Sequence, residues 1–224
     1  MTRIERPGVR AGYDRWAATY DATPNPVVAL DRRVAPTALA PRPGERVLDA
    51  GCGTGAHLAR LCGARSRALG LDFSHGMLRR AHRRVPGAAL AQADLDRPFP
   101  IAAGTFDAVL SCLVSEHLTD LRSFFGESRR ALRRGGRLVF SAFHPELARA
   151  GVEANFEQGG VEYRLGAERY TRDDYLGHIA DAGFTAIEWS EPAADDELVA
   201  AVPAAAKYRG RPLLLLVRAV RHDL

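Results

Sequence analysis

The chain has 224 residues, 46% of them hydrophobic, which is enough for one sizeable buried core, and its net charge is +4. Nearly all basic residues are arginines, with Lys207 as the one lysine, a bias more typical of a GC-rich genome than of a phosphate-binding surface. Three scattered cysteines form no disulfide framework, and no apolar run is long enough to span a bilayer. We therefore expect a cytoplasmic protein with neither membrane nor nucleic-acid partners.

The N-terminal segment, residues 1–44, precedes the first expected strand and predicts a helical cap. Within it Tyr13, Trp16 and Tyr20 recur at helical spacing, so they share one side of an amphipathic helix. We expect Trp16 to pack against the sheet.

A glycine loop follows the first predicted strand, 46–50. Asp49 closes the strand, and Gly51, Gly53 and Gly55 come after it at alternate positions. Because glycine has no Cβ, such a loop can turn sharply and approach a ligand closely. The acid before it suits a ligand with an amine or hydroxyls. Dinucleotide-binding loops have the spacing G-x-G-x-x-G, so D-x-G-x-G-x-G disfavours a nicotinamide-dependent oxidoreductase.

Two further acids follow the next predicted strands, 67–71 and 88–92. Asp72 lies about 20 residues past the glycine loop, where an acid at a strand tip can bind both hydroxyls of a ribose. Asp94 occupies the equivalent place after the third strand. The apolar period alternates between helix-like and strand-like, which indicates a doubly wound α/β sheet. Its remaining strands are predicted at 105–111, 137–143, 184–190 and 213–220.

The segment Val47-Leu-Asp-Ala-Gly-Cys-Gly-Thr-Gly55, together with Asp72 and Asp94, resembles class I S-adenosylmethionine (SAM) methyltransferases, in particular the type 11 small-molecule family. The resemblance covers roughly residues 10–145 and continues more weakly to the end. It implies a Rossmann-like sheet of seven strands in a single domain, 1–224. In this family the last strand runs antiparallel, between strands five and six.

The resemblance also implies which residues bind the cofactor, SAM. In the family the acid at Asp94 takes the adenine amino group, the residue at Met77 lies near the adenine, and a tyrosine of the N-terminal helix closes over the cofactor. The full expected set is Tyr13, Tyr20, Asp49, Gly51, Cys52, Gly53, Gly55, Asp72, Phe73, Met77, Asp94, Leu95 and Ser111.

An insertion at 146–170 interrupts the alternation after the fifth strand. It contains glycine-rich turns and the aromatics Phe156, Tyr163 and Tyr170. A long insertion at the carboxyl end of a parallel sheet lies beside the ligand crevice, so we expect it to be a substrate lid.

Two histidines follow central strands and are the candidate catalytic residues. His117 comes after the fourth strand and His144 after the fifth, and either can accept a proton from a nucleophile. Alternatively, His117 caps the next helix. For His144 the alternative is an exposed loop residue, since Pro145 keeps the backbone at His144 extended. The remaining histidines, His57 among them, fall on predicted helices or the tail and are expected to be structural. Two histidines without an evident third ligand make a poor metal site, so none is expected.

The leading hypothesis is therefore methylation of an oxygen or nitrogen atom of a small molecule, such as a natural-product intermediate, by a monomer or homodimer. Neither the Pro-Cys pair of cytosine C5-methylation nor the N/D-P-P-Y/F motif of adenine N6-methylation is present, which argues against nucleic acid. The alternatives are C-methylation of a quinone or similar ring, and a regulatory module that binds SAM without catalysis. The sequence does not distinguish the acceptors.

Overall fold

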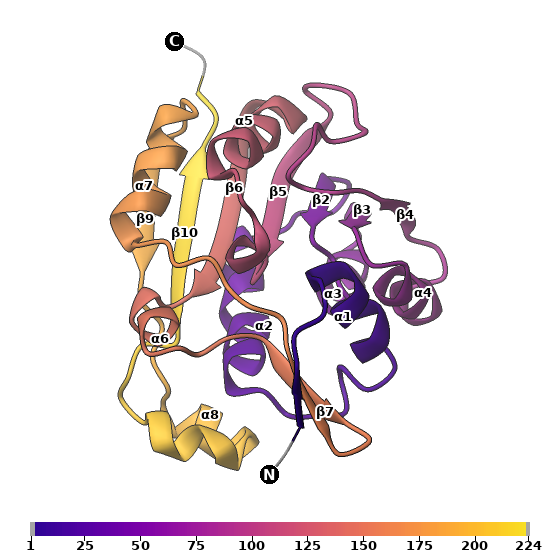
Figure 1. The fold of residues 1–224 in the computed structure, drawn as a ribbon. Coiled ribbons are helices and arrows are strands. Elements are labelled where there is room, and N and C mark those ends of the chain that lie inside the picture. The colour runs from indigo at the N-terminus through magenta and orange to yellow at the C-terminus, as the bar shows by residue number, and fades with distance from the viewer. Residues whose placement is uncertain (1–2, 223–224) are drawn as a thin grey trace.

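Seven strands form the central sheet in the order β4-β3-β2-β5-β6-β10-β9, in a computed structural model that describes residues 3–222 (Figure 1). β10 runs antiparallel to both of its neighbours, and the other strand pairs of this sheet are parallel. The predicted sheet and its antiparallel last strand are confirmed. The strands are β2 Arg46–Ala50, β3 Arg67–Asp72, β4 Ala89–Gln92, β5 Phe106–Cys112, β6 Leu132–Phe143, β9 Thr185–Ser190 and β10 Leu214–Val220.

β6 begins five residues earlier than its predicted start at 137. Its register against β5 shifts where residues 133–136 bulge out of the ladder, and Gly135 there has φ +70°. A bulge adds residues that the partner strand does not match, so the apolar pattern detects only the regular part after it.

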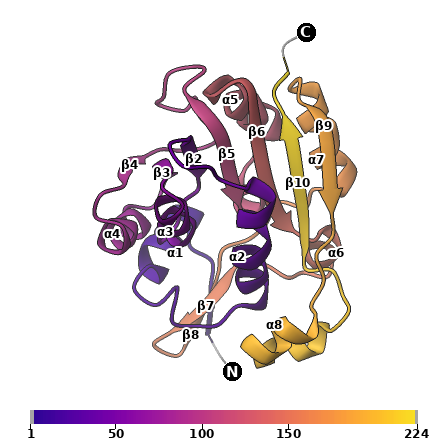
Figure 2. The same ribbon diagram turned by 180° about the vertical axis from the view of Figure 1, so that it is seen from behind.

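Helices cover both faces of the sheet (Figures 1 and 2). α2 and α3 pack on one face and α5 and α7 on the other, which explains why neighbouring strand residues such as Val47 and Leu48 are both fully buried. The helices are α1 Val9–Trp16, α2 Pro26–Leu39, α3 Ala56–Gly63, α4 His75–Arg84, α5 Leu121–Ala131, α6 Pro145–Arg149, α7 Arg172–Asp181 and α8 Asp196–Ala201, with short 3₁₀ turns η1 Ser115–His117 and η2 Pro203–Tyr208.

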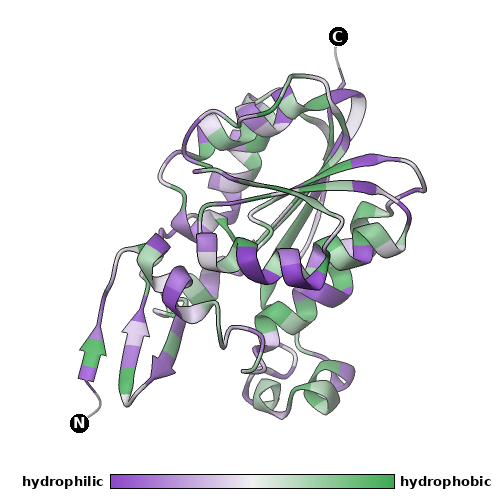
Figure 3. Ribbon diagram, turned by 90° about the vertical axis from the view of Figure 1, so that its right-hand side faces the viewer, coloured by the Kyte–Doolittle hydropathy of each residue, from purple (hydrophilic) through white to green (hydrophobic). Residues whose placement is uncertain are grey.

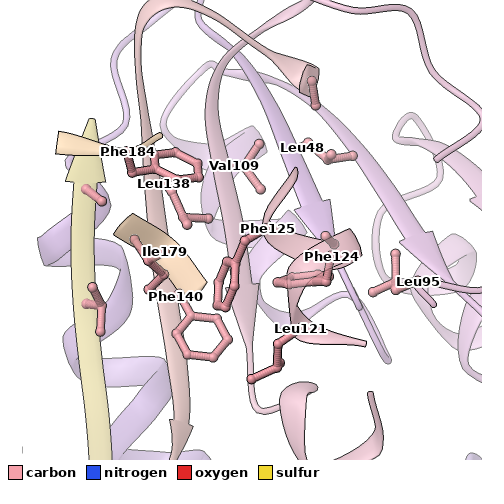
Figure 4. Close-up of a cluster of buried hydrophobic side chains, with 14 of the residues drawn as sticks. Leu48, Leu95, Val109, Leu121, Phe124, Phe125, Leu138, Phe140, Ile179 and Phe184 are labelled. Atoms are coloured by element: carbon pink, nitrogen blue, oxygen red, sulfur yellow. The ribbon is translucent and has the colours of Figure 1, made fainter. Parts of the chain in front are cut away.

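The largest core cluster lies under α5 and α7 (Figure 4). Phe124 and Phe125 of α5 lie beside Phe140 of β6, with the Phe125 and Phe140 ring centroids 5.2 Å apart. The strands of the central sheet are mostly hydrophobic, whereas the helices mix hydrophobic and hydrophilic residues (Figure 3). Among the described residues, no helix combines the length and apolar character needed to cross a bilayer.

Short polar side chains fix where the helices next to the site begin. Asn25 accepts hydrogen bonds from the backbone N–H groups of Val27 and Val28 at the start of α2. Ser74 accepts one from Met77 at the start of α4. These caps satisfy backbone donors that otherwise lack a partner within the helix.

A second, three-stranded sheet forms part of the insertion at 146–170. β7 Asn155–Gln158 and β8 Val161–Arg164 form a hairpin, and β1 Arg3–Glu5 pairs with β8 in parallel. Both residues of the hairpin turn, Gly159 and Gly160, have positive φ, which two-residue turns of this kind require. None of these three strands was predicted from the sequence, because strands of three or four residues carry too little periodicity.

α1 is attached to this hairpin through aromatic rings. Trp16 stacks on Phe156 of β7 with centroids 4.9 Å apart, and Phe156 stacks on Tyr163 of β8. The expectation that Trp16 packs on the central sheet was wrong. The closeness of this contact also requires a small residue in α1, since a Cβ on Gly12 would lie 2.1 Å from a methyl carbon of Leu165.

Candidate cofactor and acceptor site

The glycine loop after β2 adopts a backbone that only glycine adopts freely. Gly51, Gly53 and Gly55 have φ values of +88°, +52° and +80°. A Cβ on Gly51 would lie 2.2 Å from a methyl carbon of Val114, and one on Gly55 would lie 3.0 Å from Ala81 of α4. Two of the three glycines are thus required by packing as well as by conformation.

Asp72, at the end of β3, is aimed by the loop itself. One of its carboxylate oxygens accepts from the Gly53 N–H at 2.8 Å, and the other accepts from the Ser74 N–H at 2.9 Å. Burial raises the pKa of Asp72 to about 6, although these N–H donors act in the opposite direction. Each oxygen keeps a free lone pair, so the fixed carboxylate can accept two hydroxyl groups of a ribose.

A cavity of about 800 Å³ lies over the loop and the carboxyl ends of β2, β3 and β5. This volume is typical of a small-molecule or cofactor site. Ten residues of the set predicted to bind the cofactor line it: Tyr13, Tyr20, Gly51, Cys52, Gly53, Asp72, Phe73, Met77, Asp94 and Leu95.

Three residues of the predicted set, Asp49, Gly55 and Ser111, are not part of the cavity wall. Ser111 donates to the Ala50 carbonyl, and Gly55 packs on Ala81 below the loop. Asp49 is 1% exposed; burial raises its pKa to about 7, and its Oδ2 has no hydrogen-bond partner. Because Asp49 is buried behind the cavity wall, it can influence a ligand through its charge or by its effect on the backbone of the glycine loop, but not by direct contact.

Several residues outside the predicted set also line the cavity, among them Asp31 and Arg32 of α2, and His57 of α3. The Asp31 carboxylate lies 2.8 Å from His57 Nε2 and also accepts from the Ser141 hydroxyl at 2.6 Å. Burial acts to lower the pKa of His57, but the hydrogen bond and charge of Asp31 raise it overall. His57 directly follows the glycine loop, and this position was the signal that could have identified it.

Cys112, at the end of β5, joins this pair, and the three possible ligand atoms of Asp31, His57 and Cys112 lie within 4.8 Å of one another. In the part of the chain that the structure describes, this is the group with the geometry to hold a metal ion. However, both Asp31 oxygens already have hydrogen-bond partners in His57 and Ser141. The hydrogen bonds therefore account for the arrangement without a metal.

The two candidate catalytic histidines lie in different places. His117, in η1, lines the cavity, and its Nε2 is 2.9 Å from the Tyr13 hydroxyl. Burial lowers the pKa of His117 to about 4, so the imidazole is neutral near pH 7. His144 is 5% exposed and does not line the cavity. Its ring caps α6 instead: Nδ1 accepts from the Glu146 N–H at 3.4 Å, and Nε2 lies 3.4 Å from Glu191.

A smaller chamber of about 330 Å³ adjoins the larger cavity. The two share wall residues, Tyr13, Tyr20, Val28, Arg32 and Leu113. The rest of the chamber wall comes from Trp16, the loop before α2 and the start of α2, Glu116 of η1, Phe143, the segment 152–155 of the insertion, and Val202 with the turn η2. The site therefore has a large compartment over the glycine loop and a small one under the insertion, with Tyr13 of α1 and Tyr20, which follows α1, on the wall between them.

The chain is similar in sequence and fold to known methyltransferases. The family model described as a methyltransferase domain matches residues 48–140. A demethylmenaquinone methyltransferase from Beutenbergia cavernae is 38% identical over 136 residues, which cover 58% of this chain and 56% of that protein. A malonyl-[acyl-carrier protein] O-methyltransferase from Geobacter sulfurreducens is 32% identical over 207 residues, covering 83% of this chain and 73% of the relative. The chain thus spans little more than half the length of the first relative.

A solved structure from Mesorhizobium loti, described as an S-adenosylmethionine-dependent methyltransferase, superposes with a TM-score of 0.74 and 26% identity. The match covers 88% of this chain and all of that one.

Proposed function

The chain belongs to the S-adenosylmethionine-dependent methyltransferases of the class I fold, and we propose that this enzyme methylates an oxygen or nitrogen atom of a small molecule. The observation that carries the proposal is the pair of adjoining compartments. The larger has the glycine loop and the fixed Asp72 carboxylate that suit an adenosine-bearing cofactor. The smaller has room for an acceptor next to it.

When bound, SAM supplies a methyl group already activated on a sulfonium. The protein then has to hold the acceptor in line with that methyl and exclude water, and such alignment can supply about 7–11 kcal/mol of the barrier. Tyr13 and Tyr20 lie on the wall shared by both compartments, so they are suited to the alignment. The insertion residues 152–155 close the acceptor side, which supports its role as a lid.

We propose His117 rather than His144 as the histidine closest to the reaction. His117 lines the cavity and shares a hydrogen bond with Tyr13, whereas His144 caps α6 outside the cavity wall. If His117 accepts a proton from the acceptor, His117→Ala should lower kcat by about 10²–10⁴ with little change in SAM affinity. His144→Ala is the matched variant. It should lower the free energy of unfolding, because the cap of α6 is lost, and leave kcat nearly unchanged.

C-methylation of a quinone ring is the second candidate, and the similarity to a demethylmenaquinone methyltransferase favours it. Calorimetry with S-adenosylhomocysteine (SAH), the demethylated cofactor, tests the cofactor half of the proposal. Turnover of SAM with a panel of phenols, amines and naphthoquinols then separates O-, N- and C-methylation by mass spectrometry of the product. SAH binding without turnover of any acceptor would favour the non-catalytic module, and absence of SAH binding would refute the proposal.

A further inference from the structure

Glu116 differs from the other acids of the acceptor chamber, the 330 Å³ compartment. It lies in η1, lines the chamber but not the cofactor cavity, and is 6% exposed. Its Oε2 is buried and has no hydrogen-bond partner. The chamber's other acids are paired, since Asp21 binds Arg32 and Arg84, and Glu153 binds Arg6.

Within residues 3–222, no cation acts on Glu116 as a counter-charge, and Arg32, which also lines the chamber, binds Asp21 instead. The phenols of Tyr13, Tyr20 and Tyr175 feel its charge, which raises the pKa of each, although burial is the larger cause. The charged neighbour that acts on Glu116 is Asp31, another acid. Burying a carboxylate oxygen without a partner is costly, so a cationic ligand that supplied the missing partner would remove part of that cost.

Aromatic rings make up the wall nearest α1. Tyr13 and Trp16 are stacked with centroids 5.9 Å apart, and Tyr20 meets Trp16 edge-on at 4.8 Å. Phe143 and Tyr208 line other parts of the chamber. Aromatic faces attract cations, and the attraction grows when the cation is desolvated. The chamber's one lysine, Lys207, is exposed and already lies over the Tyr208 ring.

We propose that the acceptor chamber binds an amine in its protonated form, carried on a hydrophobic body, with the Glu116 carboxylate accepting an N–H hydrogen bond from it. This inference rests on the proposed methyltransferase function and narrows its acceptor to an amine. An anionic acceptor would face an unpaired carboxylate, and a neutral one would leave that carboxylate without a counter-charge.

Glu116 then also has a chemical task, because an ammonium nitrogen has no free electron pair. The ammonium first transfers one proton to the Glu116 carboxylate and becomes a neutral amine. The nitrogen lone pair next forms the N–C bond as the methyl C–S bond breaks with its electrons going to sulfur, which leaves a methylated ammonium and a thioether. The proton on Glu116 is finally released to water. Burial raises the pKa of Glu116 to about 7, which suits a group that takes and returns a proton near neutrality.

Calorimetry on the full chain saturated with SAH tests the assignment. The probes are 2-phenylethylamine, its neutral analogue 2-phenylethanol and its anionic analogue phenylacetate, with octylamine and octanol as a second hydrophobic body. Glu116→Gln removes the charge at constant size, and Glu146→Gln removes an exposed carboxylate that lines neither compartment. SAH affinity, measured first, shows whether each protein retains its cofactor site.

We expect at least one amine to bind about tenfold or more tightly than its alcohol, since hydrogen bonds to a charged group are worth about 1.5–3 kcal/mol. Glu116→Gln should abolish this preference, and Glu146→Gln should preserve it. Equal or tighter binding of the alcohols or of phenylacetate, failure of both amines to bind, or an amine preference that survives Glu116→Gln would overturn the assignment. In each of these cases normal SAH affinity would leave the methyltransferase proposal standing, whereas loss of SAH binding by the unmodified chain would refute that proposal itself.

Discussion

The two compartments are built in opposite ways. In the cofactor cavity the glycine loop and the strand-end acids Asp72 and Asp94 lie within one stretch of the chain, residues 51–95, and residues from 8–32 and 96–118 complete the wall. The Asp72 carboxylate is held by two backbone N–H groups. The acceptor chamber takes its wall from α1, α2, η1, the insertion and η2, and its Glu116 carboxylate lacks a partner on one oxygen.

This difference indicates what each compartment is organised to do. A preorganised carboxylate binds its ligand with little reorganisation, which suits a cofactor that is the same in every turnover. A buried carboxylate without a partner costs stability until the right ligand arrives, which suits selection among acceptors. The following predictions test the contrast, from the largest expected effect to the smallest.

Gly51→Ala should nearly abolish cofactor binding, weakening SAH affinity by about 100-fold or more, because a Cβ at φ +88° would also overlap the Val114 side chain. Gly44→Ala is the matched control, since Gly44 has φ +83° with open space around the Cβ position. It carries the same backbone strain and should bind SAH normally. Calorimetry measures the SAH affinity of both variants, and circular dichroism shows whether both are folded. Equal affinities in the two variants would show that the loop packing is dispensable.

Asp72→Ala should weaken SAH affinity about 10- to 100-fold, because two charge-assisted hydrogen bonds to the ribose would be lost. For the unmodified protein the affinity should fall as the pH is lowered through about 6, where the Asp72 carboxylate gains a proton. Asp181→Asn serves as a control, because the Asp181 side chain is exposed, and its SAH affinity should equal that of the unmodified protein. Normal affinity in Asp72→Ala would mean that another group binds the ribose.

Glu116→Gln should stabilise the unliganded protein at pH 8. The pKa of Glu116 is raised from 4.5 to about 7 in the folded state, so folding is penalised once the pH exceeds the unfolded value. The penalty grows as the pH rises from about 4.5 to 7, and a shift of this size corresponds to about 1–3 kcal/mol. Urea unfolding at pH 8 and pH 4.5 measures it. The stability gain should be present at pH 8 and gone at pH 4.5, whereas a variant that is less stable at both would show that Glu116 has a structural partner.

Tyr13→Phe should have the smallest effect. It removes the hydroxyl that meets His117 Nε2 but keeps the ring on the shared wall, so kcat should fall about 3- to 10-fold with SAH affinity unchanged. Tyr163→Phe is matched to it, because the Tyr163 hydroxyl binds Arg15 and lines neither compartment. Steady-state kinetics should show a loss in the first variant alone. A fall in SAH affinity instead would assign Tyr13 to the cofactor.

The sequence by itself determined the central sheet and predicted ten of the residues that line the larger cavity. Apolar runs of strand length predicted each strand of the central sheet, to within five residues at the least regular end, β6. Strand-end residues such as Asp72 and Asp94 were identified because the carboxyl ends of parallel strands meet at one edge. Residues close in sequence, held by one loop, need little tertiary information to be placed together.

Only the tertiary structure decided which side chains complete the site. Asp31 contacts His57 because α2 and α3 pack on the same face of the sheet. No sequence pattern in either helix predicts that these two side chains are paired. His144 follows a central strand as His117 does, yet its ring caps α6 while that of His117 meets Tyr13. Such outcomes depend on long-range packing, in which α1 is held by a hairpin more than a hundred residues away. No local pattern specifies contacts of that range, so the acceptor chamber and Glu116 could be recognised only in three dimensions.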